Sequence, residues 1–236
     1  MGMWDDIKQV LEHLDKTYVG RDSKGNKRTR MYAYGCSLGG SMLGLYLTSE
    51  GERAKKLLDG AVIYAAVWDL INGADYFYGN LWGIPEWVVT INYVKIMRKE
   101  QLPELRKMVS AEDYAMYDHA LTNCNSFRDL VTDIYVPNGG YESYEEWFTK
   151  NSMAQGIENI KVPTFGFTAA DDIIVDEKVT PNDAIKQGKS SFMMGKTTYG
   201  AHASHLTGTL VPRCWYPVPC AEFLNFIEDK LSPTSK

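Results

Sequence analysis

The pentapeptide Gly35-Cys36-Ser37-Leu38-Gly39 constrains this chain more than any other segment. It follows a short apolar segment, residues 31–34, with the pattern of a strand. It precedes a run rich in small residues, 39–47, with the pattern of a helix. In a strand–turn–helix context, G-x-S-x-G presents its serine as an exposed nucleophile in a strained backbone conformation. We expect a side chain at either glycine of the motif to collide across the turn. The pattern therefore predicts Ser37 as a catalytic nucleophile.

Composition excludes several classes of protein. The chain has 236 residues, of which 44% are hydrophobic and 23% charged, as in an ordinary globular domain with its own core. Its net charge of −5 predicts no nucleic-acid partner. No apolar run approaches the roughly 20 residues that a membrane-spanning helix needs, so we expect no transmembrane segment. Asp5 and Asp6 stand where a signal peptide would be basic and then apolar.

The four cysteines give no sign of a metal site. None of them forms a C-x-x-C pair: they are Cys36, Cys124, Cys214 and Cys220. We therefore expect no zinc site and no other cofactor. Four cysteines in a chain of this length favour an intracellular, reducing compartment over a disulfide scaffold, and a bridge between Cys214 and Cys220 stays open.

Strand patterns alternate with helix patterns along the chain. Apolar runs predict four strands, at 31–34, 60–67, 162–168 and 191–195. Residues 60–67 form a continuous apolar run, typical of a strand buried on both faces of a parallel sheet. Helical spacing begins at Asp5, and a closing helix is expected over 217–231. The order predicts an α/β domain built on a mainly parallel sheet.

A long insertion separates the second and third predicted strands. Residues 68–160 are rich in Trp, Tyr and Met, and helices are expected over 86–98, over 102–109 and from Ser110 onward. Ser110 opens a pattern similar to a capping box. We therefore predict a core made of residues 1–67 and 161–236, and a helical cap, residues 68–160, over Ser37.

A catalytic serine needs a base and an orienting carboxylate. Asp171 and Asp172 follow the third predicted strand, and His202 and His205 follow the fourth. We favour Asp172 as the acid because small residues and one more acid precede it, and Asp171 is the alternative. We favour His202 as the base because small residues precede it, which allows close approach to Ser37, and His205 is the alternative.

Several stretches of the chain together resemble a known family. They are Trp4-Asp5-Asp6, Gly35-Cys36-Ser37-Leu38-Gly39-Gly40, Trp68-Asp69-Leu70, Asn125 to Thr132, Gly139 to Phe148, Ile160 to Thr164, Ala170-Asp171-Asp172 and Gly200-Ala201-His202. In these stretches, which run over nearly the whole chain, the sequence resembles the YheT-like, abhydrolase-domain branch of the α/β-hydrolase superfamily. The resemblance implies an α/β-hydrolase fold with a helical cap insertion, with Ser37 as nucleophile, Asp172 as acid and His202 as base. Two departures are Ala201, where the family usually has glycine, and Ile173, where it usually has proline.

The resemblance also implies an N-terminal half that is not in this sequence. That half carries the first strands of the sheet and a loop that donates one oxyanion N–H. We therefore expect this chain to form the C-terminal part of the sheet, with the backbone N–H of Leu38 as one oxyanion donor. Residues 31–34 would then be an exposed edge strand, with which a protein partner could pair.

Two functions follow from these observations. The first is a serine hydrolase that acts on small acyl esters or lipids through Ser37, Asp172 and His202, with activity that is weak or depends on the absent strands. The second is a non-catalytic fragment of the hydrolase fold that serves as a structural subunit of a larger assembly. Reaction of Ser37 with a fluorophosphonate probe would discriminate between them.

Overall fold

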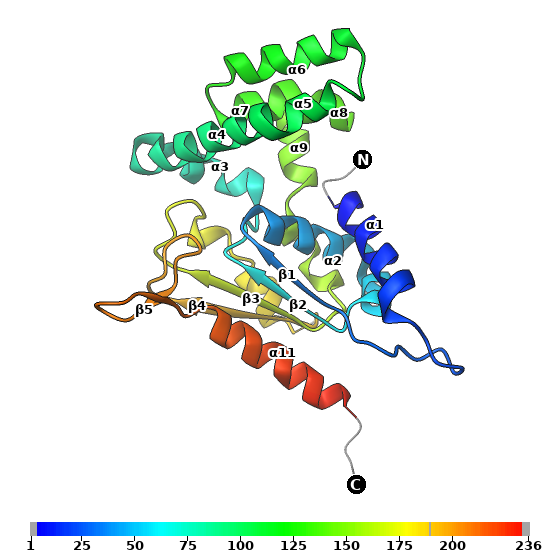
Figure 1. Cartoon of the computed structure of the whole chain (residues 1–236). Helices are drawn as coiled ribbons and strands as arrows, with labels where there is room; N and C mark the ends of the chain where they lie inside the picture. Colours follow the sequence, from blue (N-terminus) through cyan, green and yellow to red (C-terminus); the bar gives the residue numbers. More distant parts are fainter. Residues whose placement is uncertain (1–3, 189, 233–236) are drawn as a thin grey trace. The chain divides into compact units, whose positions relative to one another are not determined.

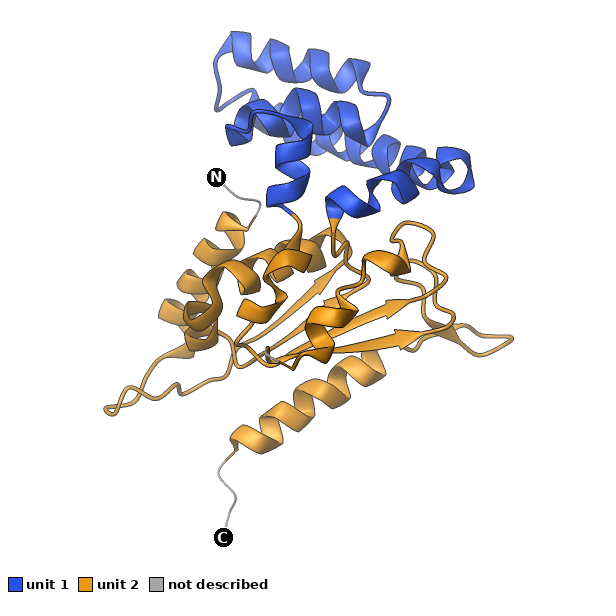
Figure 2. Ribbon diagram, turned by 180° about the vertical axis from the view of Figure 1, so that it is seen from behind, with its two compact units in different colours: residues 1, 70–151 blue, residues 2–69, 152–236 orange. Residues whose placement is uncertain are grey.

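The computed structural model describes residues 4–188 and 190–232, and the chain divides into two compact units (Figure 2). The sheet unit comprises residues 2–69 and 152–236, and the helical unit comprises residues 70–151. Of the predicted insertion, 68–160, residues 70–151 lie in the helical unit, whereas residues 68–69 and 152–160 belong to the sheet unit. Residues 152–160 pack within the sheet unit: a Cβ built on Gly44 would lie 2.0 Å from Sδ of Met153.

The sheet unit contains a four-stranded parallel sheet, as predicted. Its strands are β1 (Tyr32–Cys36), β2 (Gly60–Tyr64), β3 (Thr164–Ala169) and β4 (Phe192–Thr197), and they lie in the order β1-β2-β3-β4. All neighbouring pairs are parallel, with Tyr34 opposite Val62 and Ile63 opposite Gly166. Strand β2 ends at Tyr64, before the end of its apolar run, because the backbone of Ala65 adopts φ 47° and turns away.

Helices cover both faces of this sheet. The unit contains α1 (Asp5–Leu14), the π-helix η1 (Asp15–Val19), α2 (Leu38–Leu57), the 3-10 helices η5 (Met153–Asn159) and η6 (Glu177–Val179), α10 (Asn182–Lys186) and α11 (Pro217–Leu231). Figure 1 shows α1 and α2 on one face and α11 on the other. A short antiparallel hairpin of β5 (Leu206–Thr207) and β6 (Arg213–Cys214), which the sequence pattern did not indicate, precedes α11.

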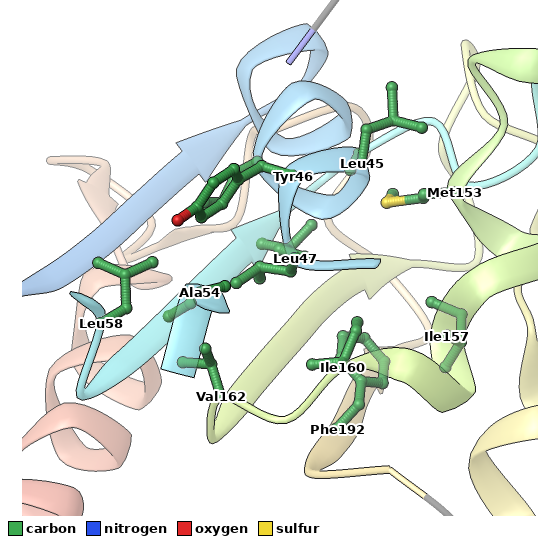
Figure 3. Close-up of a cluster of buried hydrophobic side chains, with 14 of the residues drawn as sticks. Leu45, Tyr46, Leu47, Ala54, Leu58, Met153, Ile157, Ile160, Val162 and Phe192 are labelled. Carbon is green, nitrogen blue, oxygen red and sulfur yellow. The ribbon is translucent and has the colours of Figure 1, made fainter. Parts of the chain in front are cut away.

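The side chains of β2 alternate between two hydrophobic clusters. Ala61 and Ile63 belong to the larger cluster, which includes residues of α2 and η5, and Figure 3 shows part of it. Val62 and Tyr64 belong to the smaller cluster on the α11 side, with Cys220. Because neighbouring side chains of a strand point to opposite faces, this central strand is buried on both sides.

The outer strand β1 is more exposed than the centre of the sheet. All of β3 is buried, whereas Tyr34 of β1 is 48% exposed. Within the described residues, β1 forms its ladder with β2 alone, so β1 is an edge strand of this sheet. An edge strand carries backbone N–H and C=O groups on its outer side that another strand could pair with.

The helical unit consists of short helices. They are α3 (Leu70–Gly79), η2 (Asn80–Gly83), α4 (Ile84–Ile96), η3 (Met97–Gln101), α5 (Leu102–Leu105), α6 (Ala111–Asn123), α7 (Phe127–Leu130), η4 (Val131–Tyr135), α8 (Val136–Gly139) and α9 (Tyr144–Lys150). The helix expected over 102–109 stops at Leu105. Ser110 caps α6 by accepting the N–H of Asp113, but the reciprocal capping box is found instead at Ser126 and Asp129. Across the described residues, no helix is both long and apolar enough to span a membrane.

Candidate active site

Ser37 lies at a sharp turn between β1 and α2. Its backbone adopts φ 51° and ψ −123°, a region that side-chain-bearing residues rarely occupy, and its N–H donates to the carbonyl of Tyr64 at 2.9 Å. Such a conformation costs about 1–3 kcal/mol and persists only where the surrounding structure imposes it. The turn thus holds Ser37, which is half-buried, in a strained backbone conformation.

Of the two glycine collisions expected at this turn, one is found and the other is not. A Cβ on Gly35 would lie 2.5 Å from the carbonyl oxygen of Gly39, so glycine is required there. A Cβ on Gly39 would meet nothing within 4 Å, so the expected collision at this position is wrong. The second close approach is at Gly40, where a Cβ would lie 2.9 Å from that of Ala66. The first turn of α2 therefore packs closely against β1 at Gly35, and through Gly40 against the segment that follows β2.

His202 lies within hydrogen-bonding distance of Ser37. Its Nε2 is 2.8 Å from Ser37 Oγ, and its Nδ1 is 2.8 Å from Oδ2 of Asp172. A carboxylate can only accept, so the hydrogen-bond network assigns the ring proton to Nδ1 and leaves the Nε2 lone pair facing the serine hydroxyl. A serine in this arrangement is bonded to a base that can take its proton.

Asp172 is held by the backbone that follows β3. Its side chain is buried, and Oδ1 accepts the N–H groups of Ile174 at 2.8 Å and Val175 at 3.0 Å. These bonds stabilise the negative charge of a carboxylate that has little contact with water. Oδ2 is then directed to His202, and the three predicted side chains form one continuous hydrogen-bonded chain across the carboxyl ends of the strands.

The two alternative residues occupy other positions. Asp171 is exposed, and its Oδ1 accepts the N–H of Ala201 at 2.7 Å. His205 is buried, and its ring contacts Tyr64 Oη and Thr197 Oγ1, each at 2.8 Å. The structure therefore places His202 and Asp172, and not His205 and Asp171, in line with Ser37.

The backbone around His202 is strained on both sides. Ala201 has φ 44° and Ala203 has φ 54°, both in the left-handed region that favours glycine. The loop is held by local bonds, with the N–H of Ser204 donating to the carbonyl of Gly200 at 3.0 Å and Ser204 Oγ donating to the carbonyl of His202 at 3.1 Å. The imidazole is thus presented from a conformation that alanine adopts only at a cost.

Tyr64 contributes to the site, and sequence reasoning missed it. The sequence pattern places Tyr64 in a buried strand and indicates no role for it at the strand end. Its carbonyl accepts the N–H of Ser37 and its hydroxyl contacts His205, while burial raises the pKa of its phenol to about 12. The one available signal was its place at the carboxyl end of a predicted strand, where the residues of such sites gather.

Other features of the site concern the oxyanion and metals. Leu38 is the first residue of α2, so its N–H is among those that an α-helix leaves without an internal acceptor. Burial raises the pKa of the neighbouring Cys36 thiol.

Cys214 and Cys220, whose pairing the sequence left open, are both free thiols. In the part of the chain that the structure describes, no three His, Cys, Asp or Glu side chains cluster as metal ligands would.

Comparison with known proteins finds relatives of low sequence identity. No protein-family model matches the chain. It is 24% identical over 238 residues to the monoacylglycerol lipase of Saccharomyces cerevisiae, an alignment that covers 98% of this chain and 48% of that protein. It is 26% identical over 177 residues to protein abhd-3.2 of Caenorhabditis elegans, covering 73% of this chain and 43% of that protein. The chain therefore spans about half the length of the curated relatives it matches.

The fold also has counterparts among solved structures. An α/β fold family hydrolase from Bacillus anthracis superposes with a TM-score of 0.50 at 16% identity, covering 96% of this chain and 74% of that one. That likeness concerns the fold, a parallel sheet flanked by helices. Together with the lipase and abhd-type relatives, it identifies this chain as a member of the α/β-hydrolase superfamily.

Proposed function

We propose that this protein is a serine hydrolase that cleaves carboxylic esters, with lipid acyl esters as its substrate class. The observation that carries the proposal is the hydrogen-bonded chain from Ser37 through His202 to Asp172, at 2.8 Å in both links. The substrate class is supported by the relative described as a monoacylglycerol lipase. Ser37, His202 and Asp172 are accordingly our candidates for nucleophile, base and orienting acid.

The geometry supports a two-step acyl transfer. Ser37 Oγ attacks the ester carbonyl carbon as its proton moves to Nε2 of His202, and a tetrahedral oxyanion forms. The protonated imidazole then gives this proton to the leaving alkoxide, and the C–O bond of the ester breaks. Water repeats the sequence on the acyl-serine and releases the acid. Asp172 keeps the imidazole in the required tautomer throughout.

The backbone N–H of Leu38 is our candidate for one oxyanion donor. It follows the nucleophile directly, at the N-terminus of α2, where the helix dipole also favours negative charge. The loss of one donor from an oxyanion hole costs on the order of 10²–10³ in kcat. Turnover of p-nitrophenyl esters by this chain alone therefore measures whether its oxyanion hole is complete.

A further part of the proposal concerns the free edge of β1. Within the described residues this strand pairs on one side only, and Tyr34 is 48% exposed. We propose that a strand from another segment or another protein pairs with this edge. Such a strand would cover the outer backbone groups of β1, the strand that leads into the turn at Ser37.

A fluorophosphonate probe tests the central proposal. The folded chain should form a covalent adduct at one serine, and the Ser37→Ala variant should form none. Ser23→Ala, a change in an exposed loop, should label as the wild type does. A correctly folded chain that stays unlabelled would contradict the enzymatic proposal and favour a structural subunit built on the hydrolase fold.

A further inference from the structure

A second histidine supports the loop that carries His202. We propose that His205 and Tyr64 are positioning residues that hold the His202 imidazole at hydrogen-bonding distance from Ser37. The inference rests on the proposed hydrolase function and adds two residues that do not themselves contact the reacting atoms. The following contacts carry it.

His205 anchors the end of the loop to two strands. Its side chain is 3% exposed. Nδ1 lies 2.8 Å from Tyr64 Oη at the end of β2, and Nε2 lies 2.8 Å from Thr197 Oγ1 at the end of β4. The main chain of His205 accepts the N–H of Trp215 at 2.8 Å. His205 is therefore fixed from both sides, three residues after His202.

The hydrogen-bond donors of this network are consistent with one neutral tautomer. Thr197 Oγ1 donates to the carbonyl of Thr168 at 3.4 Å, so it accepts from Nε2–H of His205. Nδ1 then accepts from the hydroxyl of Tyr64. Every polar atom of the ring has a partner without a second proton, and burial lowers the pKa of His205. A neutral imidazole in this place needs no counter-ion.

The ring of His205 also occupies the space beside the start of the loop. A Cβ on Gly200 would lie 2.3 Å from Nε2 and 2.5 Å from Cδ2 of this ring. Glycine at 200 thus allows the imidazole to pack directly against the backbone before His202. Both ends of the segment from Gly200 to His205 are held by one side chain, with the strained residues Ala201 and Ala203 between them.

Tyr64 connects this support to the nucleophile. Its carbonyl accepts the N–H of Ser37 at 2.9 Å, and its hydroxyl contacts His205. The ring is held between aromatic neighbours, with Tyr216 at 4.3 Å and Phe167 at 5.8 Å between ring centroids. A single residue of β2 therefore sets the position of the serine turn through its backbone and that of the histidine loop through its side chain.

The test compares two Tyr→Phe changes. Tyr64→Phe removes the hydroxyl that contacts His205. Tyr46→Phe is the matched control, since Tyr46 is fully buried in the same unit and its hydroxyl has no hydrogen-bond partner among the described residues. We expect Tyr64→Phe to slow fluorophosphonate labelling by about three- to tenfold, the size of one hydrogen bond. For ester turnover the loss should be in kcat, with KM unchanged. Tyr46→Phe should label at the wild-type rate.

Variants of His205 sharpen this test. His205→Asn retains an acceptor near Tyr64 and should keep most of the labelling rate, whereas His205→Leu should lose as much as Tyr64→Phe. Tyr64→Phe combined with His205→Leu should lose clearly less than the sum of the two single losses, because both changes remove the contact between Tyr64 Oη and the His205 ring, and only the longer 3.5 Å bond from the His205 N–H to Oη is left to lose. Additive losses would overturn the proposal.

A measurement that needs no activity separates this inference from the hydrolase proposal. In the ¹⁵N-labelled full chain, the proton on Nδ1 of His202, bonded to Asp172, should give a downfield signal that disappears in His202→Gln. Tyr64→Phe should broaden or shift that signal, and Tyr46→Phe should not. If the wild type shows this pattern of signals but does not react with the fluorophosphonate probe, the hydrolase proposal is refuted and the positioning role is supported. Identical spectra and labelling rates in both Phe variants would refute the positioning role alone.

Discussion

The turn at Ser37 and the loop at His202 both hold a side chain of the candidate site on strained backbone, but different contacts stabilise them. Both present a side chain from left-handed backbone, at φ 51° for Ser37 and at φ 44° and 54° for Ala201 and Ala203. The serine turn is held by backbone contacts, namely the bond from Ser37 N–H to the carbonyl of Tyr64 and the close approach at Gly35. The histidine loop has local bonds from Ser204 as well, but it also depends on side chains from distant segments, Asp171 and Tyr64.

The difference explains why one of the two segments is easier to recognise. The serine turn has no room for a side chain at particular positions, and glycines mark these positions in the sequence. The histidine loop uses Asp171, which is 30 residues away from Ala201, and Tyr64, which is 141 residues away from His205. Side-chain support of this kind leaves no local pattern. We therefore expect substitutions in the serine turn to act through steric collision, and substitutions around the histidine loop to act through the loss of individual hydrogen bonds.

The largest expected effect in the comparison is at Asp172. Asp172→Asn can still accept the N–H groups of Ile174 and Val175, but an amide directed at Nδ1 would favour the wrong tautomer of His202. We expect kcat for p-nitrophenyl ester hydrolysis to fall on the order of 10⁴-fold, with the chain folded as before. Circular dichroism checks the fold. Retention of more than a tenth of the activity would show that Asp172 does not orient the base.

Next come two glycine substitutions within the serine turn. Gly35→Ala places a Cβ 2.5 Å from a backbone oxygen that cannot rotate away, and should lower the free energy of unfolding by about 1–3 kcal/mol or more. Gly39→Ala meets open space in the first turn of a helix, and should be neutral or stabilising by up to about 1 kcal/mol. Urea unfolding of the two variants measures both values. Equal destabilisation would mean that the motif glycines are required for another reason.

These glycines also show how far prediction from the sequence reaches. The parallel sheet, Ser37, Asp172 and His202 could be located because strand runs and small-residue turns are local patterns. The end of β2 at Tyr64 could not, because apolar residues continue to Val67 while the backbone turns at Ala65. The clearance at Gly39 depends on the angle of α2, and the contact between Tyr64 and His205 depends on register, so neither is encoded locally.

A smaller effect is expected for the loop at Asp171. Asp171→Ala removes the acceptor for the N–H of Ala201, on the exposed side of the loop. Water can replace this partner, so we expect kcat to fall by about two- to fivefold, in line with a hydrogen bond worth about 0.5–1 kcal/mol. Asp171→Asn, which keeps an acceptor, should restore most of the rate. If both variants match the wild type, Asp171 has no part in holding the loop.

The smallest expected effect is on the pH dependence of stability. Burial lowers the pKa of His205 below its usual value of 6.5, although Asp171 and Asp172 act in the opposite direction. The unfolded chain therefore binds a proton more readily than the folded chain, and the free energy of unfolding should fall as the pH drops below about 6.5. Urea titrations at pH 7 and pH 5 should show a smaller difference for His205→Asn than for the wild type. His119→Asn, at an exposed position of α6, should behave as the wild type does.

The way the chain leaves the sheet unit and returns to it has a consequence for how such proteins vary. Asp69 and Ser152 stand at the two crossing points, and Ser152 Oγ donates to Asp69 Oδ1 at 3.2 Å; beside them, the N–H of Ala154 donates to the carbonyl of Trp68 at 2.9 Å. Hydrogen bonds thus join the two ends of the segment 70–151 where it leaves the sheet unit and returns to it. We therefore expect changes within residues 70–151 to leave the pairing of β2 with β3 intact. Proteins built in this way can therefore lengthen, shorten or exchange this segment without a change in the sheet.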